Sequence, residues 1–176
     1  CDGLVEMMSY WTFDDVFEEG GVPEDPFHNG FGLIAVGGIK KPAFYDYALL
    51  HRLGYERLAN SSNSILVTRR ADGSLVVAVW NLVEPNETGA PHHVKLEFHN
   101  LQPSAKVLIS RVDEKHSNSL AAYRAMGSPQ YPTRAQIEQL NRESALASPE
   151  AATLTNGALE LDVPVNGRVL VEIPRW

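Results

Sequence analysis

The sequence predicts an α+β protein in which one β/α unit is followed by a mainly antiparallel β-region with a short helical insertion. Three observations carry this prediction. A nearly continuous apolar segment over residues 4–12 precedes a helical pattern over residues 42–53. Segments rich in Val, Ile and Leu recur over residues 55–113 and again over residues 151–176. Between them, residues 114–150 carry the patterns of two short helices.

The first unit is predicted as a strand, a long loop and a helix. Residues 4–12 are apolar at almost every position, which is typical of a parallel strand covered on both faces. An acidic loop rich in Gly and Pro follows over residues 14–38, and a loop of this length in a compact domain is usually functional. Pro42 fits the first turn of a helix, and Gly54 ends it.

The β-region is predicted to contain strands at residues 65–69, 75–82, 94–98 and 106–112. The turn residues Ala71, Asp72 and Gly73 join the first two as a hairpin. Residues 159–163 and 169–173 alternate about a turn at Asn166 and Gly167, which predicts a closing hairpin.

Two helices are expected within the insertion, over residues 117–126 and 134–146. Thr133 is followed three residues later by Gln136, the spacing of a capping box, so the second helix should begin directly after Thr133. The segment from Asp113 to Asn118 lacks the ligand spacing of a calcium-binding loop and is interpreted as a structural turn.

Composition excludes several classes of function. The chain has 176 residues, a net charge of −7 and no basic stretch, so the electrostatic signature of a nucleic-acid binder is missing. No run of about 18 apolar residues would span a membrane. The single cysteine, Cys1, cannot form an internal disulfide, and the histidines lack zinc-site spacing. No metal or organic cofactor is therefore predicted, and the cellular location is left undetermined. Because the chain does not open on Met, we expect it to be cut from a longer protein.

Candidate binding residues gather where the first strand should end. The flat indole of Trp11 matches the C–H face of a pyranose, and Glu18 or Glu19 could bind sugar hydroxyls. The alternative is that Trp11 and Phe17 are core residues and that the carboxylates form a solvated turn. His28 lies in the same long loop, where it either faces a ligand or packs the loop.

A complete catalytic pair is not expected in this loop. Retaining glycoside hydrolysis needs two carboxylates about 5–5.5 Å apart on opposite sides of the scissile bond. Neighbouring residues of one loop rarely oppose each other across a substrate. No catalytic residue is therefore assigned within this chain.

Several segments resemble the family 39 glycoside hydrolases, which include β-xylosidases and their α-L-iduronidase relatives. Residues 9–19 (SYWTFDDVFEE), 26–33 (PFHNGFGL) and 38–44 (GIKKPAF) resemble the last strand, loop and helix of that family's catalytic barrel. Residues 113–118 (DEKHSN) and 126–133 (MGSPQYPT) resemble a segment of its C-terminal β-rich region. These segments occur in the family's order and cover nearly all of the chain.

The resemblance implies a (β/α)8 TIM barrel followed by a β-sandwich. Residues 1–54 would be the last strand, loop and helix of the barrel, and residues 55–176 the sandwich, with the insertion at about 114–150. The family hydrolyses glycosides with retention through two glutamates, which are expected upstream of Cys1. Trp11, Phe17, Glu18, Glu19 and His28 would contact a xyloside-like carbohydrate substrate, and the remainder of the barrel would be the chain's partner.

Two alternative hypotheses about the β-region remain open from the sequence. The β-region could be a non-catalytic carbohydrate-binding or assembly module, with Trp80 as its platform if that side chain is exposed. The apolar neighbours of Trp80 instead predict a buried strand. Alternatively, the β-region buttresses the barrel or forms the interface of a homo-oligomer.

Overall fold

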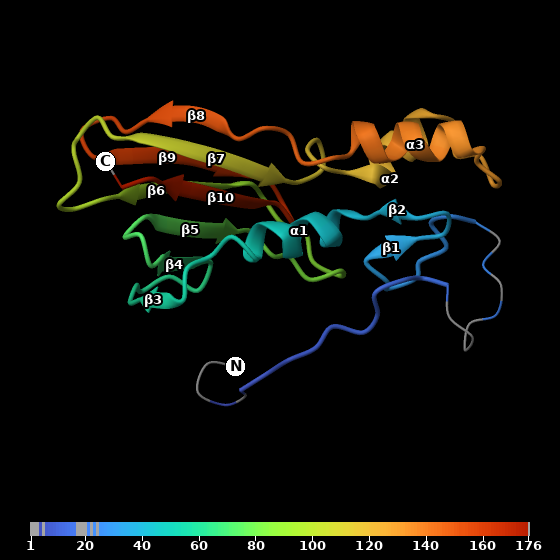
Figure 1. The fold of residues 1–176 in the computed structure, drawn as a ribbon, viewed down its shortest axis with the longest axis horizontal. Coiled ribbons are helices and arrows are strands. Elements are labelled where there is room, and N and C mark those ends of the chain that lie inside the picture. The colour runs from blue at the N-terminus through green and yellow to red at the C-terminus, as the bar shows by residue number, and fades with distance from the viewer. Residues whose placement is uncertain (1–3, 5, 17–20, 22, 24, 176) are drawn as a thin grey trace.

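The structure is a computed structural model that describes residues 4, 6–16, 21, 23 and 25–175 (Figure 1). A β-sandwich occupies one end of an elongated molecule, and a small unit of two helices and two short strands occupies the other (Figure 1). Helix α1 (Pro42–Leu50) lies between them. Residues 6–16, called the N-terminal segment below, run along the lower side of the molecule in this view.

The sandwich is antiparallel throughout its paired strands. Its larger sheet has the order β3-β4-β5-β10-β7-β8, and β6 and β9 form a second layer. The strands of the larger sheet are β3 (Glu56–Leu58), β4 (Ile65–Arg69), β5 (Leu75–Trp80), β7 (Lys106–Val112), β8 (Glu150–Thr153) and β10 (Arg168–Ile173). Those of the second layer are β6 (His92–Glu97) and β9 (Ala158–Val163).

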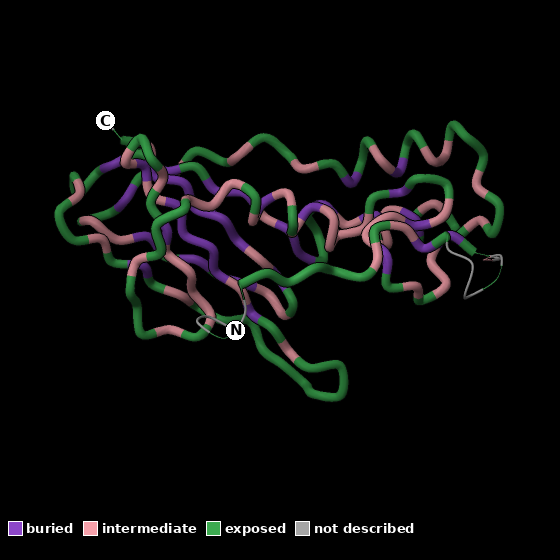
Figure 2. The backbone as a smooth tube through the Cα atoms, turned by 60° about the horizontal axis from the view of Figure 1, so that its bottom comes forward, coloured by how far each residue is buried: buried purple, intermediate pink, exposed green. Residues whose placement is uncertain are grey.

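The main core lies between these two layers. Val77 and Val79 of β5 and Val169 and Val171 of β10 face Leu161 and its neighbours on β9. Strand β9 alternates between buried and exposed positions, because only one of its faces is covered. Figure 2 shows the buried backbone concentrated along the sandwich strands.

Helix α1 covers the other face of the larger sheet. Its Tyr45 and Leu49 pack against Val76, Ala78 and Leu170, all of which are buried. The middle of β5 and most of β10 are therefore buried on both faces. This explains why their sequences are continuously apolar rather than alternating.

One buried carboxylate fastens the end of α1 to the sheet. Glu172 of β10 is 8% exposed and forms an ion pair with Arg52, just beyond the helix, and with Arg70, whose Nη2 donates to Oε1 at 2.7 Å. Arg52 also donates from Nη1 to Ser110 Oγ of β7, at 3.1 Å. Three segments of the chain thus meet at Glu172.

Local signals predicted many of these elements. The strands at residues 65–69 and 106–112 and the hairpin at residues 71–73 are confirmed. Helix α1 begins at Pro42 as predicted but ends at Leu50. The insertion contains α2 (Ser119–Ala125) and α3 (Arg134–Glu143), and the capping box of Thr133 and Gln136 is present. Strands β3 and β8, and the short pair β1 (Ile34–Ala35) and β2 (Ile39–Lys40), were not predicted.

The strand predicted over residues 4–12 is wrong for this chain. Residues 6–12 carry no strand, and Leu4, Met7 and Met8 are 80–89% exposed. A parallel strand needs hydrogen-bonding partners on its edges and cover on both faces. The described part of the chain places no strand beside residues 6–12 to provide either.

The predicted closing hairpin is also wrong. Strand β9 pairs with β6, whereas β10 pairs with β5 and β7, so the two strands lie in different layers. The buried Asn81 fixes this crossing, because its Nδ2 donates to Val163 O at 3.1 Å and its backbone oxygen accepts from Asn166 N at 2.7 Å. The apolar sides of both strands thereby face each other across the core.

Among the described residues, no helix has both the length and the apolar character needed to cross a membrane.

The ion cluster at Glu172 yields a stability prediction. Replacing Glu172 with Gln leaves two partly buried arginines without their counter-charge, so the free energy of unfolding should fall by about 2 kcal/mol. The matched control is Glu56→Gln, which breaks an exposed strand pair with Arg69 and should cost at most about 0.5 kcal/mol. Urea unfolding of the two variants measures both values, and equal losses would contradict the assignment.

Candidate functional site

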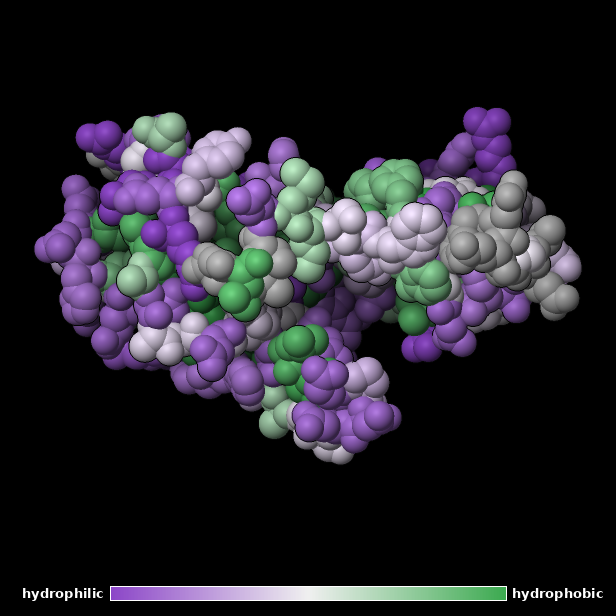
Figure 3. All heavy atoms as spheres, turned by 90° about the horizontal axis from the view of Figure 1, so that it is seen from below, coloured by the Kyte–Doolittle hydropathy of each residue, from purple (hydrophilic) through white to green (hydrophobic). Residues whose placement is uncertain are grey.

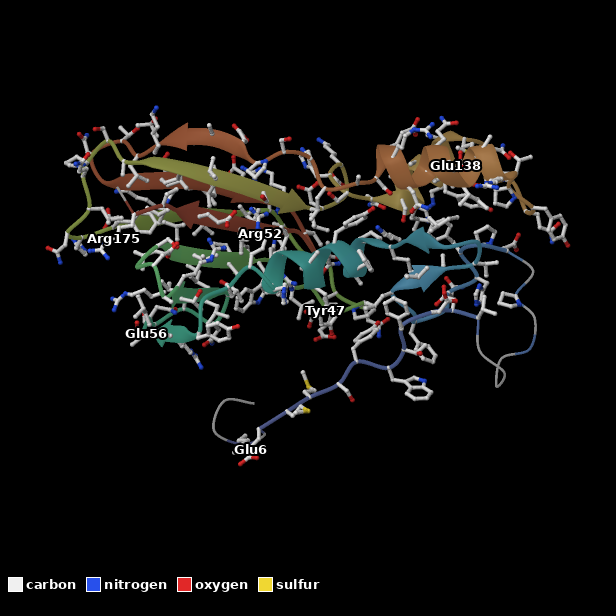
Figure 4. All side chains as sticks on the ribbon, in the orientation of Figure 1. Glu6, Tyr47, Arg52, Glu56, Glu138 and Arg175 are labelled. Carbon is white, nitrogen blue, oxygen red and sulfur yellow. The ribbon has the colours of Figure 1, made fainter. Side chains whose placement is uncertain are left out.

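The candidate site lies on the N-terminal segment, which presents aromatic side chains to solvent. Trp11 is 69% exposed and Phe13 is 63% exposed, and Met7 and Met8 precede them. Figure 4 shows this segment along the lower side of the molecule, with Glu6 near its start. Figure 3 views the molecule from the same lower side and shows apolar side chains among the hydrophilic surface. A row of exposed apolar residues of this kind marks a contact surface.

Residues 13–15 are fastened to the loop of residues 30–34. Asp15 is 2% exposed, and its Oδ1 accepts from Gly32 N at 2.6 Å. The backbone adds two bonds, from Asp15 N to Ile34 O at 2.9 Å and from Ile34 N to Phe13 O at 3.0 Å. A Cβ atom on Gly32 would lie 2.6 Å from backbone atoms of residues 14 and 15, so only glycine permits this approach.

Lys41, which is partly buried, completes this attachment. Lys41 Nζ lies 2.5 Å from Asp15 Oδ2, and both side chains are at least 86% buried, with exposures of 14% and 0%. The same ammonium donates to Gly30 O at 2.7 Å. Lys41 stands directly before α1, so the ion pair ties the N-terminal segment and the loop to the helix.

Tyr10 orients the residues just before this attachment. Its hydroxyl donates to Phe31 O at 2.6 Å, and its ring lies edge-on to Tyr47 of α1 at a centroid distance of 5.5 Å. Burial raises the pKa of Tyr10 above its usual value, and the nearby Tyr47 and Asp15 add to the shift. The peptide bond between Trp11 and Thr12 is cis. Trp11 is thus held at the surface by anchored neighbours on both sides.

His28 lies in the loop that holds this segment. It is half-buried, and its Nδ1 is 3.0 Å from Asp25 O. The preceding Phe27 packs against Tyr123 of α2 at a ring distance of 4.9 Å. A hollow of about 320 Å³ separates this loop from α2, lined by Phe27, Asn29, Gly30, Lys41, Pro42, Asn118, Leu120 and Arg124.

The structure therefore brings together the segments of two predicted binding residues, Trp11 and His28. Phe17, Glu18 and Glu19 lie outside the described residues. Asp15, Lys41 and Tyr10, which fix the segment, were not predicted from the sequence. The spacing of Gly30 and Gly32 was the available signal, because two glycines so close in a loop indicate a close backbone approach.

Other candidates take structural roles. The turn after β7 is confirmed: Asp113 Oδ1 accepts from Lys115 N at 2.8 Å, from His116 N at 2.9 Å and lies 2.8 Å from His116 Nδ1. Trp80 ends β5 and is half-buried, so it offers no open platform. Across the described ranges, no group of three or more His, Cys, Asp or Glu side chains could hold a metal ion.

Comparison with known proteins decides the family. Residues 2–159 match the family described as Glycosyl hydrolases family 39. This chain belongs to that family. The resemblance to this family, carried by residues 9–19, 26–33, 38–44, 113–118 and 126–133, is thereby confirmed. The glycosidase character of the family matches the prediction from sequence.

Family 39 relatives resemble the chain along nearly its whole length. It is 36% identical over 171 residues to a beta-xylosidase of Geobacillus stearothermophilus and 32% identical over 167 residues to a beta-xylosidase of Caldicellulosiruptor saccharolyticus. These matches cover 96% and 89% of this chain but 34% of each relative, so the chain spans about a third of their length.

A solved family 39 structure shares the fold. The GH39 beta-xylosidase of Caulobacter crescentus superposes with a TM-score of 0.80 at 31% identity, over 98% of this chain and 36% of that one. The small, mostly antiparallel arrangement with few helices is therefore that of the corresponding part of family 39 enzymes.

The buried pair of Asp15 and Lys41 yields a second prediction. Asp15→Asn keeps the shape but leaves the Lys41 ammonium without its counter-charge, so the attachment should open more often. We expect the Gly32 amide to exchange at least about tenfold faster, since losing a charged partner costs on the order of 1.5–3 kcal/mol.

The neighbouring Asp14 provides the control. Its carboxylate accepts only a local bond in the contacts described, from Val16 N at 2.7 Å, which an asparagine oxygen also accepts. Asp14→Asn should leave the Gly32 amide unchanged in hydrogen-exchange mass spectrometry. Similar effects of the two substitutions would refute the role given to Asp15.

Proposed function

We propose that this chain is the C-terminal part of a retaining glycoside hydrolase that acts on β-xylosides or related sugars. The observation that carries the proposal is the anchored N-terminal segment, which holds Trp11 69% exposed in a chain similar to beta-xylosidases. An exposed tryptophan held at a fixed position provides a flat apolar face, which suits stacking on a pyranose ring.

In this proposal residues 1–54 supply the last strand, loop and helix of a (β/α)8 barrel, and residues 55–176 form the accessory sandwich. The exposed side chains of Leu4, Met7 and Met8 support it, because neighbouring strands and helices would cover them in a closed barrel. The segment would then become a strand when the remainder of the barrel supplies the missing hydrogen-bond partners. Its site would lie at the carboxyl end of that strand, where barrel enzymes bind substrate.

The catalytic glutamates are proposed to come from the part of the enzyme that this chain does not cover. Retention requires two carboxylates about 5–5.5 Å apart across the scissile bond. Asp15 is already engaged by Lys41 and Gly32, and Asp14 accepts a local backbone bond, so neither supplies such a carboxylate. Trp11 would stack on the sugar, and His28, Phe17, Glu18 and Glu19 would complete its surroundings.

The non-catalytic binding module is the weaker alternative. The family match begins at residue 2 and includes the N-terminal segment as well as most of the sandwich. A module built on the sandwich alone would not need that segment, and Trp80 is half-buried.

A hybrid enzyme tests the proposal directly. The C-terminal third of the Geobacillus stearothermophilus beta-xylosidase is replaced by this chain, and hydrolysis of an aryl β-xyloside is measured. We expect the hybrid to turn over the xyloside, whereas the chain alone is inactive. A folded but inactive hybrid would argue against the proposal, and turnover by the chain alone would place the catalytic pair within these residues.

The role of Trp11 gives a third prediction. In the hybrid, Trp11→Ala should raise KM for the aryl xyloside about tenfold, because a lost stacking contact of about 1.4 kcal/mol corresponds to that factor. The KM of Trp11→Phe should fall between that of the parent hybrid and that of Trp11→Ala. The control is Tyr55→Ala, which removes a fully exposed aromatic ring from the segment between α1 and β3. Unchanged KM in Trp11→Ala would remove this residue from the sugar site.

A further inference from the structure

The helical insertion packs on the loop of the candidate site and forms a core separate from that of the sandwich. Ala35 and Ile39 of the β1–β2 pair are fully buried against Tyr123 of α2 and Leu140 of α3. Figure 1 shows these elements together at the end of the molecule opposite the outer end of the sandwich. An insertion in the β-region thus builds the support for a loop that lies about 100 residues earlier in the chain.

Asn141 makes the polar contact between the insertion and this loop. Its side-chain Oδ1 accepts from Lys40 N at 3.1 Å, and its Nδ2 donates to Gly38 O at 3.0 Å. A single carboxamide therefore satisfies a backbone donor of β2 and a backbone acceptor directly before it, as a neighbouring strand would. Ile137, one turn earlier on α3, lies against Gly37, whose φ is +83°.

A series of contacts links Asn141 to the residues that follow Trp11. Lys40 is followed by Lys41, whose ammonium binds Asp15 and Gly30 O. Asp15 in turn binds Gly32 N, and its own amide donates to Ile34 O. Apart from the peptide bond between Lys40 and Lys41, each step is a hydrogen bond or an ion pair. The path from α3 to the exposed segment is therefore continuous.

Helix α2 provides a second support, on the side of His28. The ring of Tyr123 is 6% exposed and packs on Phe27, the residue before His28. The Tyr123 hydroxyl donates to Pro129 O at 2.9 Å, which fixes the ring within the insertion. The hollow between the loop and α2 is lined from the insertion side by Asn118, Leu120 and Arg124.

From these contacts we propose that the α2–α3 insertion positions the loop of residues 25–41, to which the segment of Trp11 is attached. In this proposal Asn141 and Tyr123 are positioning residues for Trp11 and His28. This inference rests on the proposed function for its catalytic consequence. The coupling from α3 to residues 13–15 concerns this chain alone. The coupling and its effect on catalysis are therefore tested in separate experiments.

The first test uses Asn141→Asp in the 176-residue chain. The substitution keeps the acceptor for Lys40 N but removes the donor to Gly38 O and places a carboxylate oxygen beside it. Hydrogen exchange at the amides of Asp15 and Ile34 should become about fivefold faster, the factor expected for one lost hydrogen bond. Exchange in β5 and β10 should not change.

Gln139→Glu is the matched control for this test. It adds the same charge to the same helix and removes the bond from Nε2 to Glu143, 2.8 Å long, but it leaves the contacts of Asn141 in place. Its exchange at Asp15 and Ile34 should equal that of the parent chain. Unchanged exchange in Asn141→Asp, or equal acceleration in both variants, would overturn the coupling.

The second test measures catalysis in the hybrid enzyme described above. Asn141→Asp should raise KM for the aryl β-xyloside at least threefold while kcat stays within twofold, because binding rather than chemistry depends on the loop. Tyr123→Phe removes only the hydroxyl bond to Pro129 and should give a smaller shift in the same direction.

The outcomes separate the two proposals. An inactive parent hybrid would count against the proposed function, while the exchange experiment would still decide the coupling. An active hybrid in which Asn141→Asp has unchanged KM would overturn the positioning role, even if the exchange rates respond.

Discussion

The rest of the structure depends on the burial of strand β10, the central strand of the sandwich. Strand β10 is hydrogen-bonded along both edges, to β5 and to β7, and is covered on both faces, by β9 and by α1. A strand that is apolar on both faces is stable only when both conditions hold, because exposed backbone groups and exposed apolar side chains are each costly. Glu172 is the buried polar residue of this strand, and its two arginines offset the cost of burying its charge.

The N-terminal segment has the composition of such a strand without its surroundings. Residues 6–12 include the apolar side chains of Met7, Met8, Tyr10 and Trp11, yet no described strand pairs with them and they are exposed at almost every position. The backbone is hydrogen-bonded from Thr12 onward, and Asp15 adds its contacts with Gly32, Ile34 and Lys41. The boundary between unpaired and anchored backbone falls close to Trp11.

Supporting a loop from a distant insertion has a physical advantage. The loop between the N-terminal segment and α1 contains two short strands of two residues each, too little to be stable alone. Packing on α2 and α3 gives it a buried core of its own, and Asn141 supplies the polar pairing that a third strand would give. The loop can therefore hold a fixed shape without lying within the sandwich.

The sequence by itself determined the elements whose signals are local. Thr133 and Gln136 set the start of α3, Pro42 set the start of α1, and the turn at Asp72 and Gly73 set the first hairpin. Each involves residues within a few positions of one another, so short-range sterics and hydrogen bonding suffice. Family membership was likewise readable, because its motifs are contiguous segments of sequence.

Only the tertiary structure decided which partners those elements take. Strands β9 and β10 looked like a hairpin, but Asn81 and the opposing apolar faces separate them into two layers. The pairing of Asn141 with Gly38 and Lys40 spans about 100 residues, and the burial of Asp15 against Lys41 depends on a close approach at Gly32. Periodicity reports which face of an element is buried; it does not report what covers that face, because the covering groups lie far away in the sequence.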